Sequence, residues 1–288
     1  MLHEPIGTRA PARPLRQWVL GLLAAALLLT GRESQADKEQ KAADAAYREK
    51  LAKAQAIFAE RCKTAGVVIH RTVKDVESIE LTKVRQPVPW GGKEYFDPMW
   101  TEAAMAGEYR GHDYINQFLM TESIDWRQPD SRGTLNSPDF DTRSRYPLKR
   151  GYRFVEIKGE RDGARFRAQL GPHPPGTNLW GKAPKLTPLT ASATRYALDF
   201  EDLVDPEDRK LWIAGTVLKV VDKQTGEVIA QLTRFVWDSG FGVSTTGRWP
   251  WQHAATHGSD RECPSPPGVK NDISRKFVDT VLIPKQGD

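Results

Sequence analysis

The chain has 288 residues, of which 39% are hydrophobic and 27% charged, as expected for a globular protein with one large or two modest domains. This composition excludes a disordered chain and a coiled coil. The formal net charge is +5. Because acids interrupt basic clusters such as Lys149-Arg150, we expect no nucleic-acid partner.

The first 36 residues are predicted to be a signal peptide. Three arginines within residues 9–16 precede an apolar run of thirteen residues, 18–30, and small residues at 34–36 suit cleavage. A membrane anchor is the alternative, but thirteen apolar residues fall short of the roughly 20 that span a bilayer. Arg32 stands where a lipoprotein would carry its lipid-bearing cysteine. We therefore expect a periplasmic chain, 37–288, that forms a single domain and keeps no stable membrane anchor.

The two cysteines, Cys62 and Cys263, are predicted to form a disulfide, because paired cysteines in an exported chain are usually bonded. Cys62 ends a helical repeat that also contains Tyr47, Leu51, Ala54 and Phe58. The preceding residues from Asp37 are good helix formers without an apolar stripe, so the first turns should be exposed. After Gly66, residues 67–69 and 79–85 are predicted strands.

Residues 90–141 form an irregular region that is rich in aromatic residues and broken by glycines. Loops carry function more often than strands do, so this region is a candidate contact surface. About half of its rings are expected in the core. Residues 114–120 are predicted to form a short helix or a strand, and the sequence leaves both open.

From residue 146 onward the pattern predicts antiparallel strands. Residues 151–157 and 165–170 flank a turn with Asp162-Gly163, and residues 211–221 and 227–237 form a second, longer hairpin at the centre of the sheet. Residues 172–188 contain five prolines and are predicted to be an extended loop, followed by a strand at 194–200.

The C-terminal part is predicted to contain loops and two helices. Residues 240–251 are an expected loop, followed by a short helix that ends near Cys263, and residues 272–283 are an amphipathic helix with Asp272 as N-cap. Helices at both ends of a strand-rich middle predict an α+β fold, with a mainly antiparallel sheet and the N-terminal and short C-terminal helices packed on it.

No catalytic motif is found, so we expect neither an enzyme nor a cofactor. His253 and His257 have the spacing of a metal-binding pair on a helix, but the glutamate of zinc peptidases is missing from the spacer, and we predict no metal site. The adjacent acids Glu201-Asp202 and Glu207-Asp208 are interpreted as solvated turn residues rather than a glycosidase pair.

The segments 58–66 and 70–77 resemble a group of exported proteobacterial proteins, with further agreement at 151–156, 212–220 and Cys263-Pro264. This group is similar to the immunity proteins of type VI secretion phospholipase (lipase) effectors, which are periplasmic inhibitors. The resemblance implies a paired disulfide, a periplasmic location and a secreted lipase as partner, and it brings no catalytic residues.

We expect a partner to contact loop-borne aromatic and arginine residues. The alternative is a periplasmic enzyme or cell-envelope binding protein that acts on lipid or peptidoglycan, and a pocket with converging charged groups would favour it. The candidate contact residues are Trp90, Tyr95, Trp100, Tyr109, Trp126, Arg248, Trp249 and Trp251.

Overall fold

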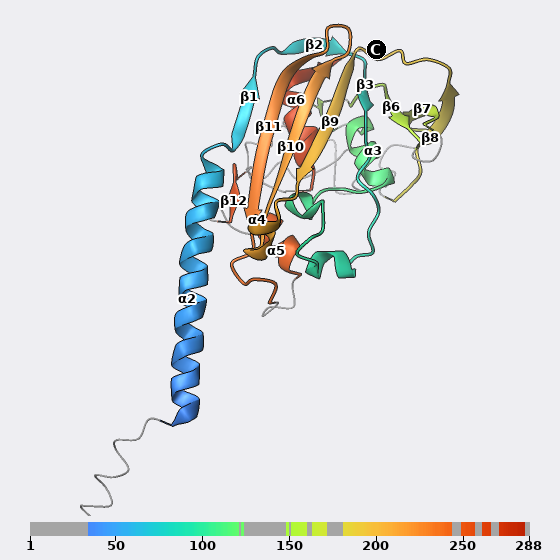
Figure 1. Ribbon diagram of the computed structural model, residues 1–288. Helices are drawn as coiled ribbons and strands as arrows, with labels where there is room; N and C mark the ends of the chain where they lie inside the picture. Colours follow the sequence, from blue (N-terminus) through green and yellow to red (C-terminus); the bar gives the residue numbers. More distant parts are fainter. Residues whose placement is uncertain are drawn as a thin grey trace, which may run out of the picture. The chain divides into compact units, whose positions relative to one another are not determined.

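The computed structural model describes residues 34–120, 122–123, 148–149, 151–159, 163–171, 181–243, 249–256, 261–265 and 271–285 (Figure 1). The chain divides into two compact units, 1–50 and 51–288, which are described separately. Among the described residues no helix is both long and apolar enough to cross a membrane.

Helix α2 (Gln35–Cys62) begins in the first unit and ends in the second. Every side chain from Ser34 to Lys50 is exposed, including Tyr47, the first member of the predicted repeat. In the second unit Ala54 and Phe58 are buried. The apolar stripe therefore begins where the sequence places it, in the second half of the helix.

The second unit is built on one sheet, to which the described residues contribute nine strands in the order β1-β11-β10-β9-β3-β6-β7-β8, with β12 also pairing β11. All pairs are antiparallel except those of β3, which runs parallel to β6 and to β9. The α+β class with a mainly antiparallel sheet is thus confirmed. The strands are β1 (Gly66–Ile69), β3 (Ser78–Leu81), β6 (Phe154–Lys158), β7 (Arg165–Gln169), β8 (Lys185–Leu189), β9 (Tyr196–Leu203), β10 (Ile213–Asp222), β11 (Glu227–Trp237) and β12 (Glu262–Cys263).

Two small sheets and several short helices complete the described structure. Strands β2 (Val73–Val76) and β13 (Leu282–Pro284) pair in parallel, and β4 (Glu122–Ser123) pairs with β5 (Leu148–Lys149). The helices are η1 (Lys93–Phe96), η2 (Ala103–Met105), α3 (His112–Leu119), α4 (Pro206–Lys210), α5 (Pro250–Thr256) and α6 (Ile273–Val281).

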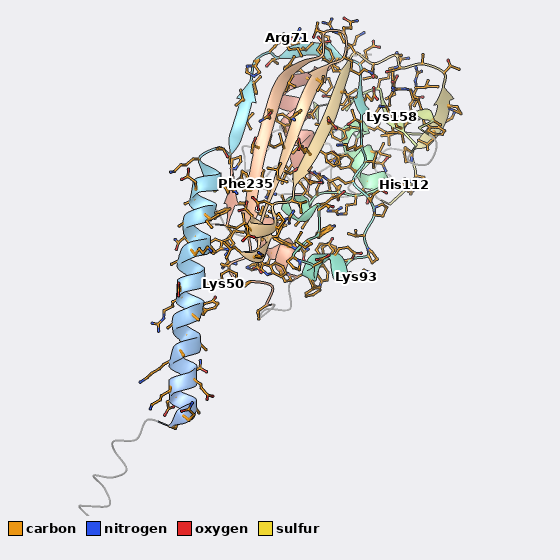
Figure 2. The ribbon with its side chains drawn as sticks, viewed as in Figure 1. Lys50, Arg71, Lys93, His112, Lys158 and Phe235 are labelled. Atoms are coloured by element: carbon orange, nitrogen blue, oxygen red, sulfur yellow. A yellow bond between two sulfur atoms is a disulfide. The ribbon has the colours of Figure 1, made fainter. Side chains whose placement is uncertain are left out.

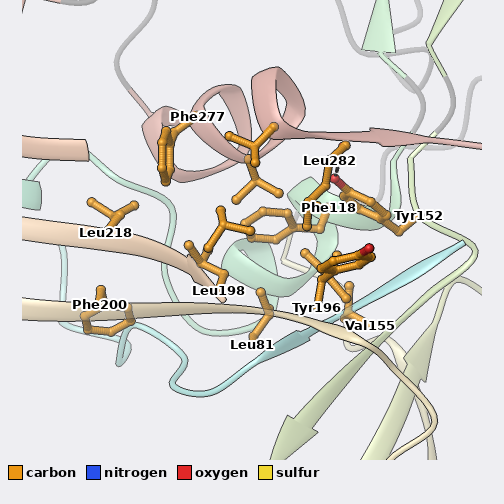
Figure 3. Close-up of a cluster of buried hydrophobic side chains, with 14 of the residues drawn as sticks. Leu81, Phe118, Tyr152, Val155, Tyr196, Leu198, Phe200, Leu218, Phe277 and Leu282 are labelled. Carbon is orange, nitrogen blue, oxygen red and sulfur yellow. Dashed lines mark hydrogen bonds between the residues drawn. The ribbon is translucent and has the colours of Figure 1, made fainter. Parts of the chain in front are cut away.

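The main hydrophobic core lies between one face of the sheet and helices α3 and α6 (Figure 3). Phe118 of α3 and Phe277 of α6 pack with Leu198 and Leu218 of the central strands. We call the face of the sheet that packs against α3 and α6 the inner face. Farther along the same face, Ala214 and Val236 belong to a second apolar cluster with residues of η1, η2 and α5.

The opposite, outer face is covered at one end by helix α2. Phe58 lies against Trp237, with 5.7 Å between ring centroids, and Ile213 and Phe235 belong to the same cluster. Both faces of β10 are therefore buried near Ile213, as its two-sided apolar pattern predicts.

Among the element boundaries that differ from the sequence predictions, three have a physical reason in the structure. Strand β3 ends at Leu81 rather than residue 85, because the chain turns so that Arg85 can reach Asp202. Residues 185–189, assigned to a loop, form strand β8, where Pro188 is tolerated because the strand lies at an edge of the sheet. Helix α5 begins at Pro250, a position that favours proline, and ends at Thr256, so that Cys263 lies in strand β12.

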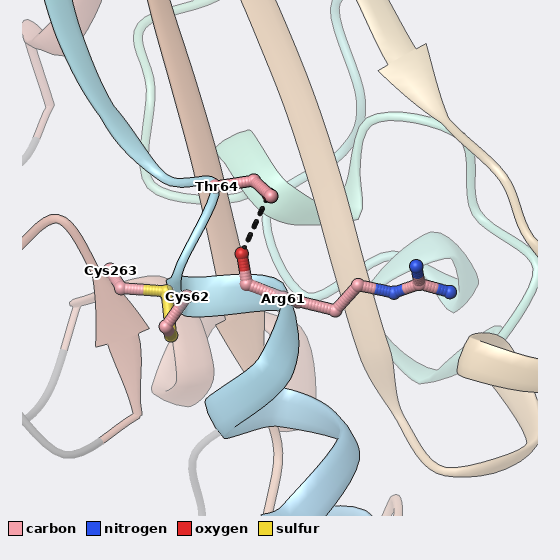
Figure 4. Close-up of a disulfide and its surroundings, with 4 residues drawn as sticks. All are labelled: Arg61, Cys62, Thr64 and Cys263. Carbon is pink, nitrogen blue, oxygen red and sulfur yellow. Dashed lines mark hydrogen bonds between the residues drawn. A yellow bond between two sulfur atoms is a disulfide. The ribbon is translucent and has the colours of Figure 1, made fainter.

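The predicted disulfide is present between Cys62 and Cys263, with 5.6 Å between the Cα atoms (Figure 4). It joins the last residue of α2 to β12, which in turn pairs with β11. The adjacent Arg61 donates to Asp208 at 2.8 Å, and Thr64 donates to the carbonyl oxygen of Arg61 at 2.8 Å. Because other contacts also hold the end of α2 in place, we expect the bond to act mainly on the unfolded chain.

We predict that replacing both Cys62 and Cys263 with alanine lowers the free energy of unfolding. The bond closes a loop with a sequence separation of 201 residues. The chain-entropy model gives about 5 kcal/mol as an upper value for such a loop. Urea unfolding of the oxidised protein and of the double variant measures the loss. Reductant should destabilise the wild type and leave the variant unchanged, and equal stability of all forms would contradict the prediction.

Candidate partner-binding surface

The residues from Trp90 to Met99 carry a group of exposed apolar side chains. Trp90 is 74% exposed, Phe96 44% and Met99 45%. We call these three residues the aromatic ridge. Phe96 is the last residue of helix η1, which Trp90 precedes and Met99 follows. Lys93 of this helix lies at the opposite end of the sheet from Arg71 (Figure 2). Exposed apolar groups of this size, gathered in one segment, are typical of interaction sites.

Trp90 rests on a column of rings that leads into the interior. Its ring meets that of Trp249 edge-on, with 4.6 Å between centroids, and also contacts Tyr95. Tyr95 in turn packs against Trp249 at 5.2 Å and against Trp100 at 5.1 Å. Because Tyr95 and Trp100 are buried, the exposed Trp90 ring has a fixed support.

The close approach of the Trp249 ring to the backbone beside Trp90 requires a glycine at position 91. Its φ of +74° is unfavourable for other residues, and a Cβ atom would lie 2.8 Å from the ring of Trp249. The ring is rigid and occupies the space that a side chain would need. The glycine therefore permits the close approach of Trp249.

Trp251 anchors the ridge segment from below. It is completely buried in α5, and its indole nitrogen donates to the carbonyl oxygen of Asp97 at 2.7 Å. Arg209 lies over the Trp251 ring, 5.4 Å from the centroid, and donates to the carbonyl oxygens of Thr101 and Leu203, each at 3.2 Å. Burial lowers the pKa of Arg209 to about 10, which still leaves it charged at neutral pH.

A row of polar residues crosses the inner face of the sheet between its two apolar clusters. Arg234 of β11, Thr216 of β10 and Asp202 of β9 are cross-strand neighbours. Thr216 donates to Asp202 at 2.8 Å, and Arg85 donates to the same carboxylate at 3.2 Å. Arg85 also stacks on Phe200, 4.0 Å from the ring centroid. We call these four residues, Arg85, Asp202, Thr216 and Arg234, the polar row.

Arg234 connects the sheet to the elements beneath the ridge. Its guanidinium donates to the carbonyl oxygen of Ala255 at 3.0 Å, to that of Ala104, and to the carboxylate of Glu262. One buried side chain therefore binds helix α5, helix η2 and strand β12. Burial lowers the pKa of Arg234 to about 10. This value is still well above neutral pH, so the residue keeps its charge and forms an ion pair with Glu262.

Glu108 is a buried carboxyl group that caps helix α6. It accepts hydrogen bonds from the backbone nitrogen of Ser274 at 2.9 Å and from the Ser274 hydroxyl at 3.1 Å. Tyr114 donates to the same hydroxyl group. Burial raises the pKa of Glu108 to about 7, although the bonds from Ser274 and the charge of Arg85 oppose the change.

The structure describes six of the eight predicted contact residues, and these fall into three groups by exposure. Trp90 is exposed, whereas Tyr109 and Trp249 are partly buried. Tyr95, Trp100 and Trp251 are buried because they form the cluster that supports the ridge, so they offer a partner little of their own surface. Trp126 and Arg248 lie outside the described residues. The sequence prediction missed Phe96 and Met99, since only the turn of η1 determines which side chains of this segment face outward.

The histidine pair considered from the sequence, His253 and His257, falls only partly within the described residues. His257 lies outside the described residues, and His253 contacts Arg261 through its ring Nε2. Within the described part of the chain there is no group of three histidine, cysteine, aspartate or glutamate side chains that could hold a metal ion.

Comparison with known proteins adds no assignment: no protein-family model matches the chain, and neither a curated protein nor a solved structure matches it.

We predict that Gly91→Ala destabilises the protein more than Gly226→Ala does. The two glycines have φ values of +74° and +75°, but a Cβ atom at Gly226 meets nothing within 4 Å. Both substitutions therefore place alanine in the same unfavourable backbone conformation. The clash with Trp249 should add about 1–3 kcal/mol to the loss of stability at Gly91. Urea unfolding measures both losses, and near-ultraviolet circular dichroism should change only for Gly91→Ala. Equal losses would show that the ring moves aside at no cost.

We predict that Glu108 makes stability fall between pH 4.5 and 7. A carboxyl group whose folded-state pKa is raised binds its proton more tightly in the folded protein. The stabilisation of the folded protein by this bound proton is complete below the unfolded-state pKa, and it is lost as the pH rises through about 7. The difference amounts to about 3 kcal/mol.

Glu108→Gln should remove this part of the pH dependence, and the exposed Glu227→Gln should leave it unchanged. Thermal unfolding of the wild type and both variants from pH 4 to 8 tests this. Parallel profiles for the wild type and Glu108→Gln would contradict it.

Proposed function

We propose that this chain is a periplasmic immunity protein that binds and inhibits a type VI secretion phospholipase effector. In this proposal residues 1–36 are a cleaved signal peptide, and the mature chain needs no cofactor and has no catalytic activity. The sequence resemblance suggests the partner class. The observation that carries the proposal is the aromatic ridge, Trp90, Phe96 and Met99, exposed above a buried cluster of rings.

The composition of the ridge suits a protein partner. Binding energy at protein interfaces is concentrated in a few residues, among which tryptophan is the most enriched, and aromatic residues and methionine are common at their centres. Trp90 offers a large ring at low conformational cost, because Trp249 and Tyr95 already restrict its position. A ridge supported in this way can bind without first becoming ordered.

The elements below the ridge keep its shape. Trp251 fixes the carbonyl group of Asp97, and Arg209 fixes that of Thr101. Arg234 holds α5 and η2 on the sheet. An inhibitor that must retain its partner benefits from such rigidity, since most differences in affinity between related complexes arise from dissociation rates.

The charge of the mature chain also fits a protein partner better than a nucleic acid. Residues 1–36 contain four arginines and two glutamates, so 38 basic and 35 acidic residues remain, and the net charge is +3. A small and mixed charge gives no extended basic surface for a phosphate backbone.

The decisive experiment is co-purification of residues 37–288 with the product of a lipase gene adjacent to its own, followed by the lipase assay with and without the chain. Tight binding with loss of lipase activity supports the proposal. Hydrolysis of phospholipid by the chain alone, or no binding, would favour the alternative of an envelope enzyme or binding protein.

We predict that Trp90→Ala weakens binding to that lipase by about 30-fold, corresponding to about 2 kcal/mol for a central hot-spot residue. The thermal stability of the chain should change little, because the ring is mostly exposed. Leu186→Ala is a matched control, since Leu186 is exposed on the distant strand β8. Titration calorimetry measures the affinities, and equal affinity of Trp90→Ala and the wild type would place the contact elsewhere.

A further inference from the structure

Strand β1 is an edge of the sheet. It pairs with β11 on one side, through Gly66 to Ile69, and no described strand lies on its other side (Figure 1). Its position is well fixed, because the disulfide at Cys62 lies just before it.

The backbone of β1 presents hydrogen-bonding groups outward at alternate residues. His70 donates its backbone N–H inward, to Ile229 of β11, at 2.9 Å. In an antiparallel ladder the backbone N–H and C=O groups of every second residue point to the same neighbouring strand. Val68, two residues before His70, therefore also bonds to β11. The N–H and C=O groups of Val67 and Ile69 therefore point away from the sheet.

The side chains of β1 are apolar and exposed on both faces. Val67 and Val68 are each 51% exposed and Ile69 is 42% exposed. Val67 and Ile69 lie on the inner face, opposite the core residues Leu232 and Ala230, and Val68 lies on the outer face. Soluble proteins commonly protect edge strands with charge or proline. The other edge, β8, carries Lys185 and Pro188, whereas β1 has neither.

We propose that β1 pairs antiparallel with β1 of a second copy of this chain, about a two-fold axis at Val68. Val67 then faces the partner's Ile69, and both residues of each pair offer outward N–H and C=O groups. Val68 faces the partner's Val68 as a pair without mutual hydrogen bonds, the closer type of antiparallel pair. The same register satisfies both copies, as a two-fold interface requires.

The charges near β1 are compatible with this pairing. Gly66 to Ile69 contains no charged residue. The nearest charged residues, Lys63 and Arg71, lie in the turn before β1 and beyond the bend at His70, so both are outside the paired segment. Within the paired segment no like charges therefore face each other, and the four-residue edge is closed by apolar contacts and backbone hydrogen bonds. A contact this short gives a weak dimer, whose population rises with protein concentration.

Cysteine crosslinking tests the register directly. Val68→Cys should form a disulfide-linked dimer under mild oxidation, because facing residues of this pair type have Cα atoms about 4.5 Å apart. Val67→Cys, which faces the partner's Ile69, should crosslink far less, and Leu186→Cys on β8 serves as a collision control. Equal crosslinking of all three would overturn the proposal.

Sedimentation equilibrium tests the contact without crosslinks. The wild type should show a monomer–dimer equilibrium, and Val68→Lys should abolish it, because two ammonium groups then face each other. Leu186→Lys should leave the equilibrium unchanged, and circular dichroism checks that each variant is folded. A wild type that stays monomeric at every concentration would overturn the proposal, even if its β1 binds a different protein. A dimer that persists in Val68→Lys would overturn it as well.

Discussion

The ion pair between Arg234 and Glu262 is the interaction on which the arrangement of the second unit depends. Both groups are buried, and their partners come from the sheet, from η2 and from α5. A buried charge that loses its partner is strongly destabilising, so these elements have little freedom to separate. Glu262 also precedes Cys263, and the polar contact and the covalent link thus fix the same strand.

The polar row explains how two apolar clusters coexist on one face of the sheet. Thr216 and Asp202 interrupt an otherwise apolar surface. Arg85 donates hydrogen bonds to the Asp202 carboxylate, and its guanidinium group stacks on the ring of Phe200. The cluster below the row supports the aromatic ridge, and the cluster above it is the main core with α3 and α6. A continuous apolar face would allow the covering segments to slide, whereas directional hydrogen bonds specify one position.

Much of this fold could be predicted from local patterns. The long hairpin of β10 and β11, the disulfide and the exposed first half of α2 follow from alternation, cysteine count and helix composition. The position of β3 between β6 and β9 could not be predicted, since no local signal indicates which distant strand a short segment will join. At the candidate site, the aromatic-rich region was predictable, but the division between buried Tyr95 and exposed Phe96 depends on the turn of η1. Arg234 was missed because an arginine in an apolar strand resembles a solvent-facing residue.

At the β1 edge of the sheet, the strand order runs against the order in which the chain is made. Strand β1 waits for β11, a partner encoded more than a hundred residues later, whereas β3 can pair first with β6 and only afterwards with β9. Helix α2 likewise completes its apolar cluster only with Phe235 and Trp237. Contacts of such long range slow folding and leave apolar segments exposed during synthesis. Strands β6, β7 and β8 can pair in chain order, but β1 and the end of α2 must wait for β11, which acts as the late template on which these two early segments become ordered.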